Sequence, residues 1–178
     1  MALVLLLGGA RSGKSALALR LAHAQPAPVV WLATAEAGDP EMAARIERHR
    51  DERPEEWRTI EEPLRLRETL AGLDRGCCVV VDCLTLWTAN ALERLGADAA
   101  ETEAAAAAEL ATLRTGLTIA VSNEVGLGLV PANELGRSYR DLLGRINTRW
   151  AAAAERSYLL VAGRALPLQH VEQLMELA

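Results

Sequence analysis

Short apolar runs alternate with longer and more polar segments along the whole chain. Each run has the length of a strand, and its unbroken apolar character is typical of strands buried on both faces of a sheet. The stretch Thr59–Glu62 predicts a further short strand or an extended segment. The clearest predicted strands are Ala2–Leu7, Val29–Ala33, Cys77–Asp82, Leu117–Val121 and Tyr158–Ala162.

The segments between these runs carry helix signals. Asp39 followed by Pro40 is typical of a helix start, with the aspartate as N-cap and the proline at the first helical position. Asn133 precedes a long segment whose apolar residues recur at steps of three and four, which predicts an amphipathic helix. The predicted helices are Lys14–Ala24, Pro40–Arg53, Leu64–Leu73, Leu84–Leu95, Ala99–Arg114 and Asn133–Glu155.

Strands that alternate with helices predict an α/β fold with a mainly parallel central sheet and helices on both faces. The 178 residues are enough for one domain, so we expect residues 1–178 to form a single unit. A turn at Gly163–Pro167 and a short helix at His170–Leu177 follow the last predicted strand. Residues from about 164 to 178 are therefore expected to be a C-terminal extension of this domain.

The most informative motif lies between the first predicted strand and the first predicted helix. Its sequence is Gly8-Gly9-Ala10-Arg11-Ser12-Gly13-Lys14-Ser15, which is the pattern of a phosphate-binding loop. Backbone N–H groups of such a loop form a concave anion site, and the helix N-terminus adds positive potential. The Lys14 ammonium would reach the β- and γ-phosphates, and the Ser15 hydroxyl would ligate Mg²⁺. The motif predicts that a nucleoside triphosphate binds, without specifying the reaction.

Ligands of parallel sheets bind at the carboxyl ends of the strands, so polar residues at those ends are site candidates. Asp82 ends a buried strand, where a phosphate-loop protein has an aspartate for Mg²⁺ or its water shell; its alternative role is a helix cap. Glu124 follows another strand and fits a site carboxylate and a turn residue equally well. Gly126 and Gly128 indicate either a mobile segment near the site or a tight loop.

The predicted helix Pro40–Arg53 carries an unusual stripe. Met42, Ile46, His49 and Arg53 recur at steps of four, three and four, so they share one helix face. The stripe begins apolar and ends in a histidine and an arginine, and a cluster of arginines beside a phosphate loop suits a polyphosphate. We expect His49 to be able to attack phosphorus. The alternative is a solvated helix with an isolated histidine.

Composition narrows the class of protein. The net charge is −5 and no long basic run occurs, which argues against a nucleic-acid partner. Cys77, Cys78 and Cys83 lie in or beside an apolar strand, without metal-ligand spacing to a histidine, and we expect buried thiols in a reducing compartment. No apolar run approaches the roughly 20 residues of a membrane span. We therefore expect a cytoplasmic protein.

Taken together, these residues resemble the bifunctional adenosylcobinamide kinase / adenosylcobinamide-phosphate guanylyltransferase family. The histidine helix and the Asn-Glu-Val-Gly segment make the resemblance specific, and it spans about Leu3 to Gly163. Besides the phosphate loop, the matching stretches are Ala43–Ile46 with His49, Arg53-Pro54 with Trp57–Thr59, Val81–Thr85, Ser122–Gly126 with Gly128 and Val130-Pro131, and Gly144–Asn147.

The resemblance implies a RecA-like P-loop fold and two reactions of cobalamin biosynthesis. In the first, ATP or GTP donates its γ-phosphoryl group to the side-arm hydroxyl of adenosylcobinamide. In the second, the family's histidine attacks the α-phosphate of GTP, releases pyrophosphate, and passes GMP to adenosylcobinamide phosphate to give adenosylcobinamide-GDP. By this resemblance His49, Lys14 and Asp82 are catalytic, and Ser15 and Asp82 hold Mg²⁺ directly or through water.

The resemblance also implies the nucleotide contacts and the assembly. Some members of the family are homotrimers, so a homo-oligomer is expected here. The expected nucleotide-binding residues are Gly8, Gly9, Ala10, Arg11, Ser12, Gly13, Lys14, Ser15, Ala33, Thr34, Ala35, Arg50, Asp51, Glu52, Arg53, Glu61 and Asp82.

Two alternative functions remain open from the sequence. One is a P-loop kinase of small molecules with a single activity, in which His49 is structural. The other is a RecA-like module that uses a nucleotide to act on a macromolecular partner. The acidic net charge and the lack of a basic stripe count against the second alternative.

Overall fold

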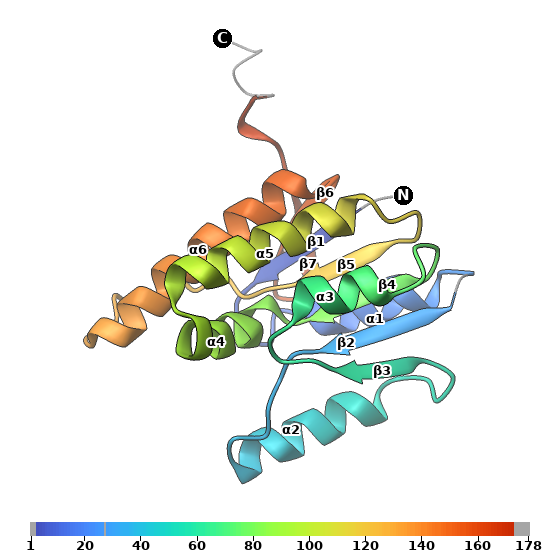
Figure 1. The fold of residues 1–178 in the computed structure, drawn as a ribbon, viewed down its shortest axis with the longest axis horizontal. Helices are drawn as coiled ribbons and strands as arrows, with labels where there is room; N and C mark the ends of the chain where they lie inside the picture. The colour runs from blue at the N-terminus through green and yellow to red at the C-terminus, as the bar shows by residue number, and fades with distance from the viewer. Residues whose placement is uncertain (1–2, 27, 173–178) are drawn as a thin grey trace.

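The structure is a computed structural model that describes residues 3–26 and 28–172. In these residues the chain forms a seven-stranded sheet with the order β3-β2-β4-β5-β1-β6-β7 (Figure 1). Neighbouring strands are parallel from β3 through β6, and β7 is antiparallel to β6. The strands are β1 (Leu3–Gly8), β2 (Val29–Ala33), β3 (Arg58–Glu61), β4 (Cys78–Asp82), β5 (Thr118–Val121), β6 (Arg156–Val161) and β7 (Arg164–Leu168).

Helices cover the two faces of the sheet unequally. The helices α3 to α6 pack on one face, α1 packs on the other, and α2 lies beyond the β3 edge (Figure 1). Within the described residues, no helix combines the length and the apolar character that a membrane span requires. The helices are α1 (Lys14–His23), α2 (Pro40–Asp51), α3 (Leu66–Gly72), α4 (Leu84–Leu95), α5 (Ala97–Thr112) and α6 (Glu134–Ala153).

The apolar runs in β1, β2, β4 and β5 are buried on both faces, as predicted, whereas the run in β6 is only partly buried, because this strand lies near the edge of the sheet. In β1, Leu3, Leu5 and Leu7 pack into the core under α3 to α6, because successive side chains of a strand point to opposite faces. Val4 and Leu6 pack into the smaller core under α1. Every residue of β1 and β2 is buried, which explains why these segments show no alternation of apolar and polar positions.

The predicted helix starts at Asp39 and Asn133 are confirmed. The Asp39 carboxylate accepts a hydrogen bond of 2.7 Å from the N–H of Met42, and Pro40 occupies the first position of α2. The Asn133 side chain accepts one of 2.6 Å from the N–H of Gly136. Each cap satisfies an N–H group that has no partner inside the helix.

The prediction of a turn over Gly163–Pro167 is wrong. Residues Arg164–Leu168 form β7, and the turn is reduced to Ala162 and Gly163, whose φ angles are 50° and 76°. Positive φ at both central residues matches the twist of a tight two-residue hairpin. Pro167 is tolerated because β7 is an edge strand. The predicted helix at His170–Leu177 lies mostly outside the described residues, which end at residue 172.

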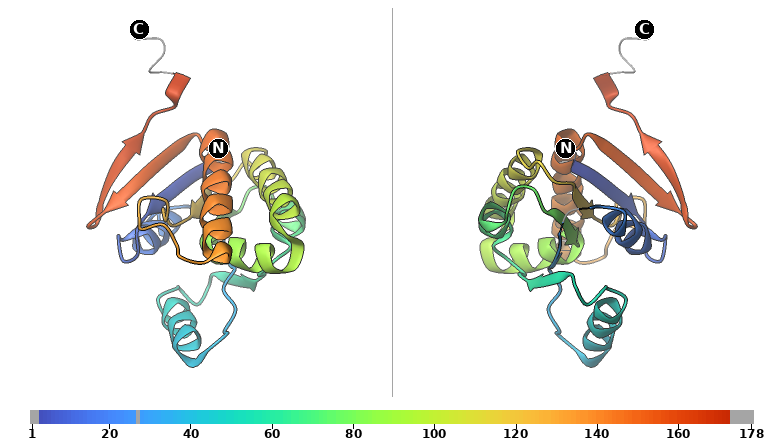
Figure 2. Two further views of the ribbon diagram at one scale, coloured as in Figure 1. Left: turned by 90° about the vertical axis from the view of Figure 1, so that its left-hand side faces the viewer. Right: turned by 90° about the vertical axis from the view of Figure 1, so that its right-hand side faces the viewer.

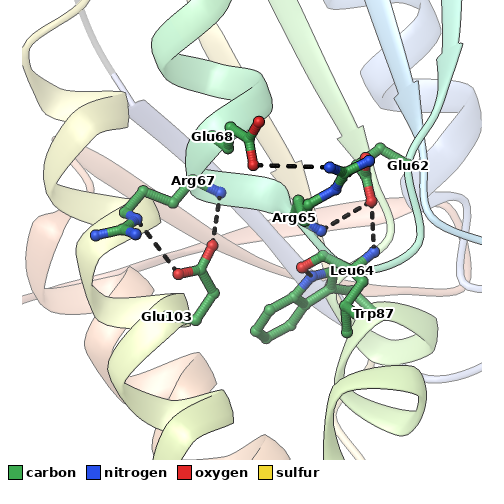
Figure 3. A network of polar contacts seen from close by, with 7 residues as sticks. All are labelled: Glu62, Leu64, Arg65, Arg67, Glu68, Trp87 and Glu103. Carbon is green, nitrogen blue, oxygen red and sulfur yellow. Dashed lines mark hydrogen bonds and ion pairs between the residues drawn. The ribbon is translucent and has the colours of Figure 1, made fainter. Parts of the chain in front are cut away.

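A polar network fixes the connection from β3 to α3 (Figure 3). The Glu62 carboxylate accepts a hydrogen bond of 2.9 Å from the N–H of Leu64, whose carbonyl accepts one of 2.9 Å from the indole N–H of Trp87. Arg67 meets Glu103 of α5 through its backbone N–H at 3.1 Å and its guanidinium at 3.4 Å. These contacts tie α3 to α4 and α5, so the end of β3 has a defined position at the edge of the sheet.

Candidate active site

The phosphate-loop sequence adopts the predicted strand–turn–helix geometry, between the end of β1 and the start of α1. Gly8 has a φ of +152°, and a Cβ at this position would overlap the carbonyl oxygen of Leu160 in β6. Only glycine therefore fits where the strand turns into the loop. The turn directs the N-terminus of α1 toward the carboxyl edge of the sheet, where its N–H groups favour an anion.

Lys14 folds back into the loop. Its ammonium donates hydrogen bonds to the carbonyl oxygens of Gly8 and Gly9, at 2.9 and 2.7 Å, and to the Ser12 hydroxyl at 3.3 Å. Only 7% of Lys14 is exposed. Burial lowers the pKa of Lys14, an effect that nearby Cys83 and Asp82 oppose. Phosphate oxygens would supply this desolvated cation with stronger partners than the loop carbonyls do.

The β6–β7 hairpin braces the phosphate loop, a contact that the sequence did not reveal. The N–H of Gly163 at the tip of the hairpin donates a hydrogen bond of 3.0 Å to the carbonyl of Ser12. A Cβ at Gly13 would lie 3.4 Å from the Cα of Gly163, so the two backbones pass close together. Gly163 indicates a turn at this point, but the local sequence alone predicts a longer turn, over Gly163–Pro167.

The end of β4 is held by Thr34, which follows the neighbouring strand β2. The Thr34 hydroxyl donates to the carbonyl of Cys83 at 2.7 Å and accepts from the N–H of the same residue at 2.8 Å. The N–H of Thr34 donates to the carbonyl of Asp82 at 3.1 Å, and Asn90 donates to the Thr34 carbonyl at 2.9 Å. Thr34 is completely buried. These bonds fix the backbone on both sides of the Asp82 side chain.

His49 of α2 faces Asp82. Its Nδ1 lies 3.8 Å from the Asp82 Oδ2, and the two side chains are 29% and 12% exposed. The predicted stripe is confirmed as the inward face of α2, because Met42, Ile46 and His49 are half-buried whereas the other residues of the helix are exposed. α2 lies outside the sheet edge, so even this face is only partly covered. The contact joins α2 to the carboxyl edge of the sheet.

Arg53 fixes the end of this helix segment against the sheet. The helix ends at Asp51, earlier than predicted, and the Arg53 guanidinium lies 4.8 Å from the ring centroid of Trp31 in β2. It also donates a hydrogen bond of 3.3 Å to the Thr59 hydroxyl. Trp57 stacks on Trp31 with a centroid distance of 6.1 Å. Burial lowers the pKa of Arg53, and the negative charge of Asp82 opposes this lowering. No local pattern in the sequence predicts this cation–π contact.

Most of the predicted nucleotide-binding residues lie where β1, β2, β3 and β4 end, whereas Arg50–Arg53 lie at and after the end of α2, which runs back toward the start of β3 (Figure 1). The left panel of Figure 2 looks onto the ends of the strands, with α2 below the sheet. Ala33 and Glu61 are paired between β2 and β3, and Ala33 and Asp82 between β2 and β4. Exposed members of the set are Gly9, Ala10, Arg11, Arg50, Asp51, Glu52 and Glu61; half-buried members are Gly13, Ser15, Ala35, Arg53 and Asp82; buried members are Gly8, Ser12, Lys14, Ala33 and Thr34.

A buried polar network fixes the end of β5 beside the phosphate loop. The Ser122 hydroxyl donates to the Asn147 side chain at 2.6 Å, which in turn donates to the Asn123 carbonyl at 3.0 Å. The N–H of Asn123 donates to the Thr85 hydroxyl at 2.7 Å, and that of Glu124 to the Gly8 carbonyl at 3.2 Å. Sequence reasoning gave Thr85 and Asn147 no role, although polar residues on buried helix faces are a usable signal.

Hard oxygen donors for Mg²⁺ are present at the loop. The Ser15 hydroxyl lies in the first turn of α1, and the Asp82 carboxylate ends β4. Among the described residues, no group of three or more histidine, cysteine, aspartate or glutamate side chains is arranged to hold a metal ion by itself. Serine and aspartate nevertheless fit a Mg²⁺ site that is completed by phosphate oxygens and water.

Comparison with solved structures supports the fold. The chain resembles an ATPase from the type III secretion system of pathogenic bacteria, with a TM-score of 0.58 at 11% sequence identity. The match covers 98% of this chain and 60% of the ATPase chain. Together with the mainly parallel sheet, this likeness confirms the predicted α/β fold of the RecA-like P-loop class.

Comparison of sequences shows the family. A family model described as cobinamide kinase / cobinamide phosphate guanyltransferase matches residues 4–168. The chain is 48% identical over 166 residues to the bifunctional adenosylcobalamin biosynthesis protein CobP of Pseudomonas aeruginosa, covering 93% of this chain and 96% of that protein. It is 39% and 40% identical to the CobU proteins of Escherichia coli and Salmonella typhimurium, covering 90% of this chain and 96% of each relative. The chain therefore belongs to the cobinamide kinase / cobinamide phosphate guanyltransferase family.

Proposed function

We propose that one site in this chain serves both activities of its family, with the phosphate loop common to the two and His49 specific to the second. The observation that carries the proposal is the approach of His49 to Asp82 at the edge of the sheet that bears the loop. Transfer of a γ-phosphoryl group needs positioning and charge stabilisation but no covalent intermediate. A histidine in this position therefore points to a second kind of transfer.

In the kinase reaction, the side-arm hydroxyl of adenosylcobinamide attacks the γ-phosphorus of ATP or GTP. The bond from that phosphorus to the β–γ bridging oxygen breaks, the nucleoside diphosphate leaves, and the hydroxyl proton is released to water. Lys14 and the N–H groups at the start of α1 stabilise the charge on the phosphates. Ser15 and Asp82 would hold Mg²⁺, which offsets negative charge on the phosphate oxygens when it is bound.

In the guanylyltransferase reaction, His49 Nε2 attacks the α-phosphorus of GTP. The bond to the α–β bridging oxygen breaks, pyrophosphate leaves, and a histidine–GMP phosphoramidate forms. A phosphate oxygen of adenosylcobinamide phosphate then attacks the same phosphorus, the P–N bond breaks, and adenosylcobinamide-GDP is released. With Nδ1 nearest Asp82, a proton on Nδ1 would leave the Nε2 lone pair free, and the carboxylate would stabilise the positively charged intermediate.

The arginines of α2 support a polyphosphate at this site. Burial lowers the pKa of Lys14, and the positive charge of Arg45 adds a smaller lowering. Arg53, close to the end of the same segment, is oriented by Trp31 and Thr59. Cations along α2 and in the loop would together face a triphosphate whose α-phosphate lies toward His49.

The expected homo-oligomer, a trimer by resemblance, belongs to the same proposal, as does a cytoplasmic location. Support for self-association comes from the outer edge of the sheet, where Val161, Leu166 and Leu168 are 56%, 57% and 42% exposed. Light scattering coupled to size-exclusion chromatography measures the number of subunits. A monomer at working concentrations would contradict this part of the proposal.

Incubation with α-³²P-GTP and Mg²⁺ tests the covalent step. We expect an acid-labile, alkali-stable label on the protein that is lost in His49→Ala and kept in His23→Ala, which changes an exposed histidine at the end of α1. His49→Ala should still phosphorylate adenosylcobinamide with ATP. A label that persists in His49→Ala, or a wild-type protein that binds GTP without being labelled, would contradict the proposal and favour a kinase with a single activity.

A further inference from the structure

The loop that joins β5 to α6 presents large apolar side chains to solvent. Leu127, Leu129 and Val130 are 83%, 96% and 66% exposed, and Leu135 in the first turn of α6 is 70% exposed. We refer to these four residues as the apolar loop surface. Several exposed large apolar residues within so short a segment mark a binding surface rather than ordinary surface composition.

The backbone on either side of these residues is held in place. At the start of the loop, the N–H of Glu124 donates to the Gly8 carbonyl at 3.2 Å, and its carboxylate accepts from the N–H of Gly126 at 2.7 Å. At the end, the Arg137 guanidinium donates to the carbonyls of Pro131 and Ala132, at 3.1 and 2.8 Å. The loop is therefore anchored at both ends while its apolar side chains project outward, which lowers the conformational entropy lost on binding a ligand.

The apolar loop surface lies next to the phosphate loop. The Glu124–Gly8 hydrogen bond joins the two loops directly, because β5 and β1 are neighbours in the sheet. The left panel of Figure 2 shows the β5–α6 loop on the face that carries the phosphate loop and α2. A ligand resting on the apolar loop surface would consequently have its edge close to the γ-phosphate position.

We propose that the apolar loop surface binds the corrin ring of adenosylcobinamide and directs its side-arm hydroxyl toward the phosphate loop. This inference rests on the proposed function, because the acceptor must be a corrinoid. A corrin is a broad macrocycle with methyl groups on its periphery, and contact with leucine and valine side chains would desolvate both partners. The hydroxyl sits on an arm of this ring, so the ring must lie within an arm's length of the γ-phosphate.

The test compares two double variants with the wild type. Leu127→Ser with Leu129→Ser removes apolar contact from exposed positions, whereas Leu127→Met with Leu129→Met keeps it. Leu113 lies at the C-terminal end of α5 and is 61% exposed, so Leu113→Ser controls for the loss of a surface leucine elsewhere on the molecule. The readouts are the KM for adenosylcobinamide in the kinase assay, the KM for ATP, and labelling by α-³²P-GTP without corrinoid.

We expect the serine double variant to raise the KM for adenosylcobinamide by about tenfold or more, with the KM for ATP and the GTP labelling unchanged. The methionine variant and Leu113→Ser should behave as wild type. An unchanged KM for adenosylcobinamide in the serine double variant would overturn the inference. A loss of GTP labelling as large as the loss of kinase activity would also overturn it, as would a change of oligomeric state that accounts for the raised KM. A wild-type protein that neither phosphorylates adenosylcobinamide nor is labelled by GTP would instead refute the proposed function.

Discussion

Replacing Thr34 with valine should weaken both the fold and the site. Valine has nearly the same shape but lacks the hydroxyl that donates to the Cys83 carbonyl at 2.7 Å and accepts from its N–H at 2.8 Å. Each backbone group left without a partner costs about 1–3 kcal/mol, and half-buried Cys83 has some access to water, so we expect a loss of about 2–4 kcal/mol of unfolding free energy. For a chain of this size that corresponds to a Tm lower by about 5–15 °C.

The control is Thr34→Ser, which keeps both hydrogen bonds and removes one methyl group, at a cost of about 1 kcal/mol. Thermal unfolding followed by circular dichroism compares the two variants, and steady-state assays compare both transfer reactions. Because the lost bonds hold the backbone next to Asp82, Thr34→Val should slow both reactions by about tenfold relative to Thr34→Ser. A Tm for Thr34→Val within about 2 °C of that for Thr34→Ser would refute the reasoning.

Three further predictions follow from individual residues. Gly8→Ala should cost at least about 2 kcal/mol, because the new Cβ would overlap the Leu160 carbonyl, whereas Gly144→Ala meets open space; equal thermal melts of the two variants would contradict this. Lys14 is the only lysine in the sequence, and burial lowers its pKa from 10.5. The unfolded chain then holds this proton to higher pH than the folded one, so Lys14 contributes stability that rises with pH between its lowered pKa and 10.5, whereas the raised pKa values of Cys78, Cys83 and Tyr139 act in the opposite direction. In urea unfolding at stepped pH, the difference in unfolding free energy between the wild type and Lys14→Met should therefore shift in favour of the wild type as the pH rises over this range. Burial raises the pKa of Cys78 to about 12, so iodoacetamide at pH 8 should modify this thiol only after unfolding, as mass spectrometry can show.

Much of the fold could be predicted because single segments decide it. Continuous apolar runs can satisfy both faces of a central strand, and Asp39-Pro40 and Asn133 start helices through local hydrogen bonds alone. The strand β7 could not be predicted in this way. Gly163 and Pro167 are turn and breaker residues by local preference, but pairing with β6 outweighs that preference, and the edge position tolerates the proline.

Sequence patterns allow single candidate residues to be chosen, but they do not predict how those residues are arranged. Helical periodicity gives the face of α2 that His49 shares with Met42 and Ile46, and that face is the half-buried one. Periodicity does not say where the helix lies, and its position outside β3 depends on long-range contacts such as that of Arg53 with Trp31. The order of the strands likewise brings Asp82 beside Ala33 and lets the Thr34 hydroxyl hold Cys83. Such contacts join elements that are far apart in the sequence.

The strand order suggests how one phosphate loop can serve two transfers. Along the carboxyl edge, α2 with His49 lies on the β3–β2 side, Asp82 ends β4 in the middle, and the apolar loop surface follows β5 next to the phosphate loop after β1. Because β5 lies between β4 and β1, the apolar loop surface lies between Asp82 and the phosphate loop along this edge. The two proposed nucleophiles would therefore differ in the phosphorus that they attack, the corrinoid hydroxyl at the γ-phosphorus and His49 at the α-phosphorus. In-line attack requires the leaving group behind the attacked phosphorus. A nucleophile aligned with the β–γ bridging oxygen at the γ-phosphorus is not aligned with the α–β bridging oxygen at the α-phosphorus, so the second reaction needs a nucleophile of its own.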